Sequence, residues 1–363
     1  MNNNHLTYFK IENFKKFDSL EVCDIGQFNL IVGDNNVGKT CLLEALLFDE
    51  DGQQLLNNFY LALTKRGLKF QIEKITKEIK GISTTETIYP KKNYFKEYIF
   101  GKKTGGLIIH YSIKNKACNI EIDVIKNLQD NVNLHKFLEI EKEDFLKQFI
   151  EIKFDNNSFS EGDSPWIYDY NLDILNFPLI SFNDTPLEDE AIKIYETLKT
   201  KQEKEILLNA LKVVNDKIVG IDFRGNFNDL KSVFLISYED KDDYFPLNYM
   251  GDGFKRIFYI VLKMLSLKGK RILIDEIEIG VHYSKMKDFW IKIMKVCKEL
   301  DVQLFATTHS QECIEAYSEA SKELNEKDIR LIRLQENKDK SIKAICYPFE
   351  AVEYFVESNT EER

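Results

Sequence analysis

The stretch that decides the fold runs from Phe28 to Leu47 and reads FNLIVGDNNVGKTCLLEALL. Its first residues are apolar, and a short apolar run of this kind is typical of a buried strand. The loop Gly33–Thr40 follows and matches the pattern G-x-x-x-x-G-K-[ST]. The residues from Thr40 onward favour a helix. A strand before this pattern and a helix after it are its phosphate-binding context, so the sequence predicts a P-loop.

Each part of the predicted P-loop has an expected role in binding ATP. The glycines let backbone N–H groups surround the phosphates, and the start of the following helix adds its dipole. Lys39 is expected to neutralise the β- and γ-phosphates, and Thr40 to ligate Mg²⁺. The expected nucleotide-binding residues of the loop are Gly33, Asn35, Asn36, Val37, Gly38, Lys39, Thr40 and Cys41.

A second motif, RILIDE, spans Arg271 to Glu276 and predicts a buried strand that ends in two carboxylates. Burying adjacent charges is costly unless a cation balances them, and Mg²⁺ would be that cation. We therefore expect Asp275 to hold Mg²⁺ and Glu276 to orient or deprotonate the attacking water. Taken alone, the motif would fit acidic residues that cap a turn, but the accompanying P-loop favours the catalytic interpretation.

A third motif, FATTHS, spans Phe305 to Ser310 and again ends an apolar strand in polar residues. A single histidine is more often structural than catalytic. Ligands of open α/β sheets, however, bind at the carboxyl ends of the parallel strands, where His309 is expected to lie. His309 is therefore predicted to donate a hydrogen bond to the γ-phosphate or to the attacking water.

A fourth motif, MGDGFKR, spans Met250 to Arg256 and opens a predicted helix. Asp252 between two permissive glycines would serve as an ordinary helix cap. The same residues would equally suit a second helix N-terminus that contacts phosphate. The residues alone favour neither interpretation.

The remaining pattern predicts an α/β fold. Short alternating runs before the P-loop favour antiparallel strands. The apolar strands Arg271–Ile274 and Gln303–Thr307, with the helix Tyr283–Leu300 between them, indicate a parallel sheet. Two further strands, Ile329–Leu334 and Ile342–Tyr347, are expected near the end, followed by an acidic helix. We expect an ATPase core formed by residues 1–50 and 220–363, an inserted lobe of mixed strands and helices at 51–185, and a helical segment at 186–219 for partner or dimer contact.

Composition narrows the class of protein. Apolar residues make up 44% and charged residues 30% of the chain, which is an ordinary globular mixture. Charge interrupts every apolar run before the length of a membrane helix, and six scattered cysteines form no C-x-x-C pair, so a cytoplasmic protein without a membrane partner is expected. The net charge of −10 disfavours wrapping by nucleic acid. Lys and Arg nevertheless outnumber Glu from Lys65 to Lys103, which suits either a solvated lobe or a patch for an anionic partner such as DNA.

Taken in their order along the chain, the four motifs resemble those of ABC-type ATPases of the SMC/RecF group. Gly33–Thr40 resembles Walker A, Ile272–Glu276 Walker B, Gly280–Ser284 the D-loop and His309 the switch histidine. The segment Met250–Arg256 stands where that group has its signature motif, although it departs from Leu-Ser-Gly-Gly. The fold implied is a P-loop ABC-type ATPase head with N-terminal antiparallel strands, a parallel core sheet and an inserted α/β and helical region.

A narrower resemblance is to the OLD-like AAA ATPases of bacterial anti-phage systems such as PARIS and Septu. It is carried by NNVGKTCLLEA from Asn35, MGDG from Met250, IDEIEIGVHYS from Ile274 and TTHS from Thr307. The resemblance implies a homodimer or higher oligomer that sandwiches ATP. The signature residues Gly251, Asp252, Gly253 and Arg256 would then contact the nucleotide of the other subunit. Hydrolysis of ATP would act as a switch on a partner.

Proteins of the OLD family also carry a Toprim nuclease domain, which needs a Glu and an Asp-x-Asp pattern. The segment from His309 to Arg363 is too short for such a domain, and Arg330 interrupts the Asp-x-Asp pattern that would begin at Asp328. The resemblance therefore implies that a nuclease or toxin effector is a separate polypeptide, and that this chain is the sensor and ATPase of a two-component defence system. A RecF- or SMC-like DNA repair ATPase is the main alternative, and the divergent signature disfavours a transporter subunit.

Overall fold

The computed structural model describes residues 5–66, 73–79, 82–88, 106–113, 116–125, 149–154, 157–160, 174–182, 188–212, 214–227 and 230–357. Its centre is a sheet of six strands in the order β10-β14-β15-β3-β16-β17. All neighbours in this sheet are parallel except β16 and β17. The bounds of these strands are Leu179–Ile180 (β10), Arg271–Ile274 (β14), Gln303–Thr307 (β15), Phe28–Gly33 (β3), Ile329–Glu336 (β16) and Ile342–Pro348 (β17).

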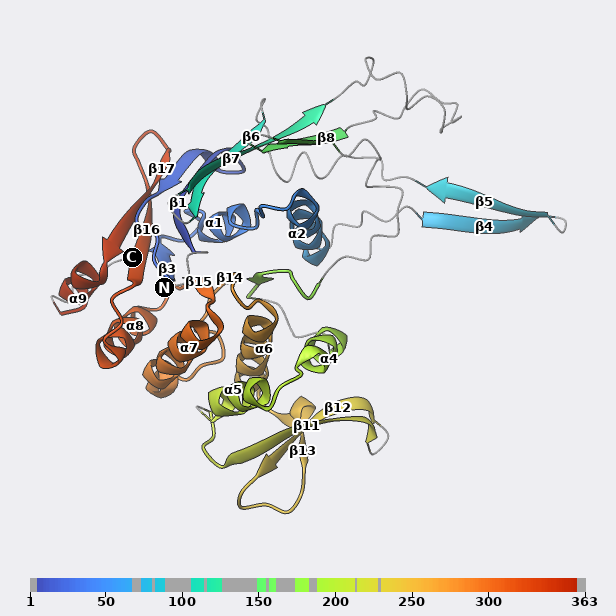
Figure 1. Ribbon diagram of the computed structural model, residues 1–363, viewed down its shortest axis with the longest axis vertical. Helices are drawn as coiled ribbons and strands as arrows, with labels where there is room; N and C mark the ends of the chain where they lie inside the picture. The colour runs from blue at the N-terminus through green and yellow to red at the C-terminus, as the bar shows by residue number, and fades with distance from the viewer. Residues whose placement is uncertain are drawn as a thin grey trace.

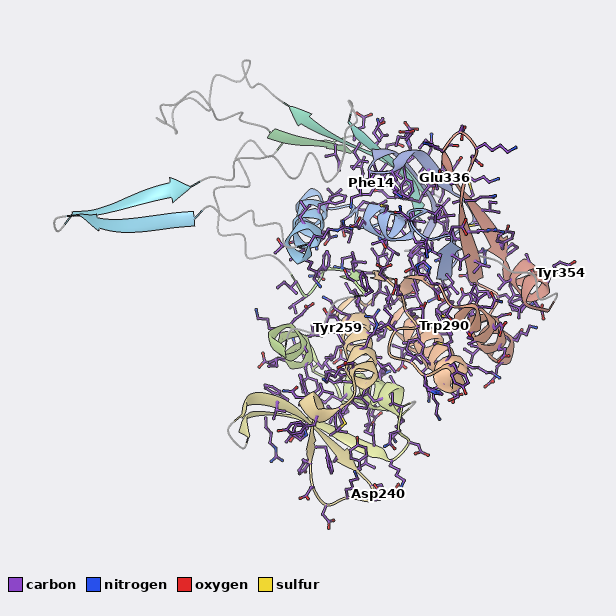
Figure 2. The ribbon with its side chains drawn as sticks, turned by 180° about the vertical axis from the view of Figure 1, so that it is seen from behind. Phe14, Asp240, Tyr259, Trp290, Glu336 and Tyr354 are labelled. Atoms are coloured by element: carbon purple, nitrogen blue, oxygen red, sulfur yellow. The ribbon has the colours of Figure 1, made fainter. Side chains whose placement is uncertain are left out.

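Both faces of the core sheet are covered, which explains why its strands are apolar throughout rather than alternating. In β3, Leu30 and Val32 belong to one hydrophobic cluster and Ile31 belongs to the other. Helices pack on the first face, and Figure 1 shows three of them side by side below the sheet. These three are α6 (Asp252–Ser266), α7 (Met286–Leu300) and α8 (Gln311–Leu324). Tyr259 of α6 and Trp290 of α7 are fully buried in this layer (Figure 2).

The second face packs against α1 (Lys39–Ala45), α2 (Gly52–Lys65) and an antiparallel sheet. This second sheet has the order β2-β1-β6-β7-β8-β9. Its strands are β1 (Leu6–Phe14), β2 (Phe17–Val22), β6 (Leu107–Ile113), β7 (Lys116–Ile125), β8 (Phe149–Phe154) and β9 (Asn157–Ser160). The P-loop helix α1 is thus enclosed between the two sheets (Figure 1).

The remaining elements lie outside these layers. A small antiparallel sheet has the order β11-β12-β13, with bounds Ile218–Phe227, Leu230–Tyr238 and Phe245–Pro246, and it lies beyond α5 in Figure 1. The helices α4 (Glu188–Thr197) and α5 (Lys201–Leu211) connect it to α6 by packing. A separate hairpin is formed by β4 (Glu73–Ile79) and β5 (Ile82–Ile88). The last described element is α9 (Phe349–Glu357), which packs on α8.

The predicted α/β architecture is confirmed: antiparallel strands precede a parallel core sheet. The strands predicted at Arg271–Ile274 and Gln303–Thr307 have the bounds found in the structure. The helical stretch predicted after residue 186 is two helices, because Thr200 forms a capping box with Glu203 and starts α5 anew. The helix predicted from Tyr283 begins at Met286, after a 3₁₀ turn.

The structure also bears on the basic segment and on the question of membrane helices. Most side chains of the basic segment Lys65–Lys103 lie outside the described residues, so its two interpretations stay open. Within the part of the chain that the structure describes, no helix is both long and apolar enough to cross a membrane.

A buried ion pair fastens α4 to α6. The Nζ atom of Lys263 lies 2.7 Å from Oε1 of Glu190, and both side chains are almost completely buried. Lys263 also donates a hydrogen bond of 2.6 Å to the carbonyl of Ile174. The pair therefore joins three segments that are distant in sequence. Removing one partner of a buried pair leaves the other charge without its counter-ion, which is strongly destabilising.

We predict that Glu190→Ala lowers the free energy of unfolding by about 3 kcal/mol, because the Lys263 ammonium then stays buried without its carboxylate. Urea denaturation followed by circular dichroism measures this change. Glu196→Ala, at an exposed position on the same helix, is the matched control and should alter stability little. Equal effects of the two substitutions would contradict the prediction. The double variant Glu190→Ala/Lys263→Met should recover part of the loss.

Candidate active site

The predicted site residues come together at one edge of the core sheet. Strands β14, β15 and β3 are neighbours and run parallel, so their carboxyl ends meet at the same edge. Asp275 and Glu276 follow β14, His309 follows β15, and the P-loop follows β3. The fold thus brings three motifs that are far apart in the sequence within hydrogen-bonding distance of one another.

The P-loop has a backbone that requires its glycines. Gly33 has φ 143° and Gly38 has φ 115°, values that side chains disfavour. A Cβ atom on Gly33 would also lie 2.5 Å from the carbonyl oxygen of Leu334. Asn36 adopts a left-handed φ of 66°, and asparagine tolerates this region better than most residues. The loop therefore turns tightly from β3 into α1.

Lys39 lies in the middle of this loop and is 5% exposed. Its Nζ atom donates to the carbonyls of Gly33 at 2.6 Å and Asp34 at 3.1 Å, and it lies 3.3 Å from Nδ1 of His309. Burial lowers the pKa of Lys39, while the nearby carboxylate of Asp275 partly opposes this shift. An ammonium held inside such a loop is suited to pair with phosphate oxygens.

Asp275 is the buried carboxylate of the site, at 4% exposure. The hydroxyl of Thr40 lies 3.1 Å and 3.3 Å from its two oxygens, and the hydroxyl of Thr307 donates to Oδ1 at 2.7 Å. These contacts come from neutral groups, so the carboxylate can still bind a cation. A carboxylate beside a hydroxyl, both hard oxygen donors, fits Mg²⁺, which typically takes one or two protein ligands together with phosphates and water. Thr40 and Asp275 are therefore the residues that would hold the ion.

Glu276 is oriented differently from its neighbour. Its φ of 49° is left-handed, which turns the chain sharply after β14. Its side chain is one-third exposed, and its Oε1 atom lies 3.9 Å from Nε2 of His309. The two adjacent carboxylates are thus separated: Asp275 faces Thr40, and Glu276 faces His309. A partly exposed carboxylate beside an imidazole is a suitable arrangement for activating water.

His309 is held by its backbone as well as its ring. Its N–H donates to Oε1 of Glu278 at 3.0 Å. Beside it is a cavity of about 320 Å³, lined by Val32, Gly33, Asp34, Asn35, Thr308, His309, Gln311 and Ile314. The P-loop and the start of α8 therefore form the two walls of a hollow at the sheet edge.

The N-terminus of α6 lies next to the loop after β14. A Cβ atom on Gly253 would lie 1.8 Å from the carbonyl oxygen of Gly280, so the two backbones are in direct contact. Gly280 has φ 81°, which a glycine adopts without strain. Gly251 has open space around its Cα, and the side chain of Asp252 is fully exposed. In the predicted signature segment, Gly251 and Asp252 thus face solvent, whereas Gly253 packs against its own chain.

Arg256 was predicted to face another subunit, and the structure places it elsewhere. It is 7% exposed, and its Nη2 atom donates to the carbonyls of Asp275 at 2.7 Å and Glu276 at 2.9 Å. Its Nη1 atom donates to the carbonyls of Ser181 and Phe182 at 3.4 Å and 3.3 Å. The correction has a simple cause: the carbonyls at the ends of β10 and β14 need donors, and a guanidinium supplies five N–H groups.

A charge cluster around the buried carboxylate of Glu44 supports the P-loop helix. Glu44 of α1 pairs with Lys15 from the turn between β1 and β2, and with Arg66 at the end of α2. Burial lowers the pKa of Lys15 to about 8 against the opposing effect of Glu44. The cluster ties α1 both to the antiparallel sheet and to the end of α2.

Sequence reasoning missed three residues of the site. Lys16 donates from its Nζ atom to the carbonyl and the side chain of Asn36, which places an exposed cation on the P-loop. Thr307 and Glu278 bond to the acidic motif and to His309, respectively. Thr307, two residues before His309, was visible in the sequence, but its partners depend on which strands are neighbours. Among the other predicted loop residues, Val37 is buried, Cys41 is half-buried and Asn35 is exposed.

Known proteins resemble this chain over most of its length. A protein from Helicobacter pylori (strain ATCC 700392 / 26695) named ATP/GTP phosphatase is 26% identical over 400 residues, covering 96% of this chain and 97% of its own length. An Smc head domain from Pyrococcus furiosus, solved with the C-terminal domain of ScpA, has a TM-score of 0.55 at 11% identity and covers 98% of this chain and 100% of its own. A second SmcHead structure, bound to the C-winged helix domain of ScpA, has a TM-score of 0.51 at 13% identity over 96% and 99% of the two chains.

The structural likenesses establish the fold, which is that of an SMC head domain. The family comparison goes further, because its match runs from residue 28 to residue 315 and so includes the P-loop, the α6 segment, the acidic motif and His309. The chain is an ATPase and belongs to the family described as AAA domain, putative AbiEii toxin, type IV toxin–antitoxin system.

Proposed function

We propose that this ATPase is the switch subunit of a two-component anti-phage defence system in the cytoplasm. It would sense infection and use ATP binding and hydrolysis to control a separate effector, such as a Toprim-type nuclease or a toxin. Two observations support the proposal: the motifs resemble those of OLD-like defence ATPases, and the matching family is described in terms of a toxin–antitoxin system.

The hydrolytic role rests on the arrangement at the sheet edge. Lys39 would pair with the β- and γ-phosphates of ATP, and Thr40 and Asp275 would hold Mg²⁺, which would neutralise charge on the phosphates. Glu276 would accept a proton from the attacking water, and His309, 3.9 Å from Glu276, would orient that water or the γ-phosphate. The separation of the two adjacent carboxylates is what allows one to bind the ion while the other stays free for the water.

The observation that carries the switch proposal is the exposed start of α6. Gly251 and Asp252 face solvent beside the carboxyl end of β14. Tyr249, two residues before Gly251, and Tyr283, three residues after Gly280, are 78% and 72% exposed. Exposed aromatic residues of this size are enriched in protein interfaces. A second copy of the chain would cover this surface and place its nucleotide against Gly251 and Asp252. ATP would then hold the dimer together, and hydrolysis would release it.

DNA repair of the RecF or SMC kind is the second candidate. The feature that favours it is the basic run Lys65–Lys103 with its interspersed aromatic residues. Contact with DNA phosphates releases counter-ions, so affinity for duplex DNA would fall steeply with salt, and DNA would stimulate hydrolysis. Salt-independent or absent DNA binding would favour the defence proposal.

The proposed catalytic roles of Lys39 and Glu276 can be tested with two variants. Lys39→Ala should abolish ATP binding, because it removes the cation of the loop. Glu276→Gln should bind ATP with near-normal affinity and slow its turnover by about 100-fold or more, because the amide cannot accept a proton. Fluorescent-nucleotide titration and phosphate release measure the two steps separately. Unchanged turnover in Glu276→Gln would show that another group is the base.

The second prediction concerns assembly. Glu276→Gln with Mg·ATP should have the mass of a dimer in solution, and it should recruit or release the product of a neighbouring effector gene according to the nucleotide. Adding Asp252→Arg should dissociate this dimer, because a large side chain then occupies the phosphate-facing surface. Asp242→Arg is the matched control: Asp242 is exposed and lies two residues after Asp240, which Figure 2 labels at the far end of the small sheet. Equal masses for the Asp252 and Asp242 variants would argue against an interface at α6.

A further inference from the structure

Thr307 is a buried residue with an unusually well-defined position. It is the last residue of β15, it is 1% exposed, and it pairs with Ile31 of β3 on one side. On the other side its hydroxyl makes two hydrogen bonds to consecutive residues. It lies 2.8 Å from the backbone nitrogen of Glu276 and 2.7 Å from Oδ1 of Asp275.

The direction of these two bonds follows from chemistry. A backbone N–H can only donate, so the hydroxyl oxygen accepts from Glu276. A hydroxyl has a single proton, which is then given to the carboxylate of Asp275. The pair of bonds therefore requires Asp275 to act as an acceptor, and it uses the full donor capacity of Thr307. A serine could form the same pair, whereas a valine of similar shape could form neither.

The bond between Thr307 and Glu276 matters because the backbone of Glu276 has an unfavourable, left-handed conformation. A non-glycine residue rarely adopts a φ near 49°, so the surrounding contacts must hold this turn in place. Four hydrogen bonds do so. Thr307 accepts from the N–H of Glu276, and the carbonyl of Thr307 accepts from the N–H of Ile277 at 3.1 Å. The carbonyl of Glu276 accepts from Arg256 at 2.9 Å and from the N–H of Ile279 at 3.2 Å. Thr307 takes part in two of these four bonds. The direction of the Glu276 side chain toward His309 depends on this turn.

The bond to Asp275 acts on the neighbouring carboxylate. Thr307 is bonded to Oδ1, and Thr40 lies nearest to Oδ2, at 3.1 Å. The two threonine hydroxyls thus bracket the carboxylate and set its rotation. Polar groups behind a metal ligand commonly determine its orientation in this way, and their loss costs about 10- to 100-fold in metal affinity or activity.

We propose that Thr307 is the positioning residue of this active site: one hydroxyl sets the backbone of Glu276 and the carboxylate of Asp275 together. The inference rests on the proposed roles of those two residues. Thr307 itself is 1% exposed, so it would contact neither the nucleotide nor the attacking water. It acts by coupling the ion-binding carboxylate to the water-activating one, so that both take their working orientation when β14 and β15 pair.

The test compares Thr307→Val with Thr307→Ser. The valine variant should lower kcat for ATP about 10- to 100-fold with little change in KM, because Lys39 and the P-loop are untouched. The serine variant should stay within a few-fold of the original protein, because it keeps the hydroxyl. Thr197→Val is the matched control, since that hydroxyl bonds only to Ile194 of its own helix. If the valine variant does not fold, Thr307→Ala against Thr307→Ser gives the same comparison, because these two differ only in the hydroxyl.

A second measurement does not depend on activity. Hydrogen–deuterium exchange of the peptide containing Glu276, in the nucleotide-free protein, should be about 10-fold faster or more in Thr307→Val and unchanged in Thr307→Ser and Thr197→Val. Unchanged kcat and unchanged exchange in the valine variant would overturn the proposal. Equal losses in the serine and valine variants would also overturn it, because the methyl group would then be the important part.

Comparing the turnover of Glu276→Gln with that of Thr307→Val separates this inference from the proposed function. If Glu276→Gln hydrolyses ATP as fast as the original protein, the catalytic role of Glu276 is wrong. The positioning role of Thr307 is then also wrong, even if hydrogen exchange shows that Thr307 holds the turn. If Glu276→Gln is inactive and Thr307→Val keeps full kcat, the catalytic assignment stands and the role of Thr307 is wrong.

Discussion

The carboxylate of Asp275, buried at the end of β14, is the constraint on which the arrangement of the site depends. A buried charge must be compensated by hydrogen bonds and a cation. Here the hydroxyl of Thr307 approaches it from the end of the neighbouring strand β15, and the hydroxyl of Thr40 approaches it from the start of α1. Satisfying this one group requires that β14 and β15 end where the P-loop helix begins. The order β14-β15-β3 in the core sheet meets that requirement. The position of Lys39, Glu276 and His309 follows from it.

The start of α6 extends this arrangement to the protein surface. Arg256 bonds to the carbonyls of Asp275 and Glu276, and Gly253 contacts the backbone of Gly280. The exposed residues Gly251 and Asp252 are therefore connected to the catalytic edge through the Arg256 side chain and the backbone contact between Gly253 and Gly280. A molecule that binds to the exposed start of α6 would act directly on the turn that carries Glu276. Such a connection suits an ATPase that works as a switch.

The same principle operates on the opposite side of the P-loop. Glu44 links α1 to the antiparallel sheet through Lys15 and to the end of α2 through Arg66. The Arg66 side chain is 48% exposed, so the buried part of this cluster is the pair between Glu44 and Lys15. Removing the carboxylate would leave the Lys15 ammonium buried without its counter-ion. The nucleotide loop is thus held from both the parallel sheet and the antiparallel one.

The sequence by itself determined the local chemistry of this protein. The P-loop, the acidic end of β14 and the polar end of β15 were recognisable because each depends on a few consecutive residues, and the strands Arg271–Ile274 and Gln303–Thr307 were predicted with their observed bounds. The division of residues 186–218 into α4, α5 and the start of β11 was missed, since a single capping box outweighed the helical periodicity there. Only the tertiary structure decided that Arg256 turns inward, that Glu278 holds the backbone of His309 and that Thr307 joins Asp275 to Glu276. These contacts link residues up to 75 positions apart. They depend on which strands are neighbours and on where a buried carbonyl or carboxylate needs a donor, and neither is encoded in a local pattern.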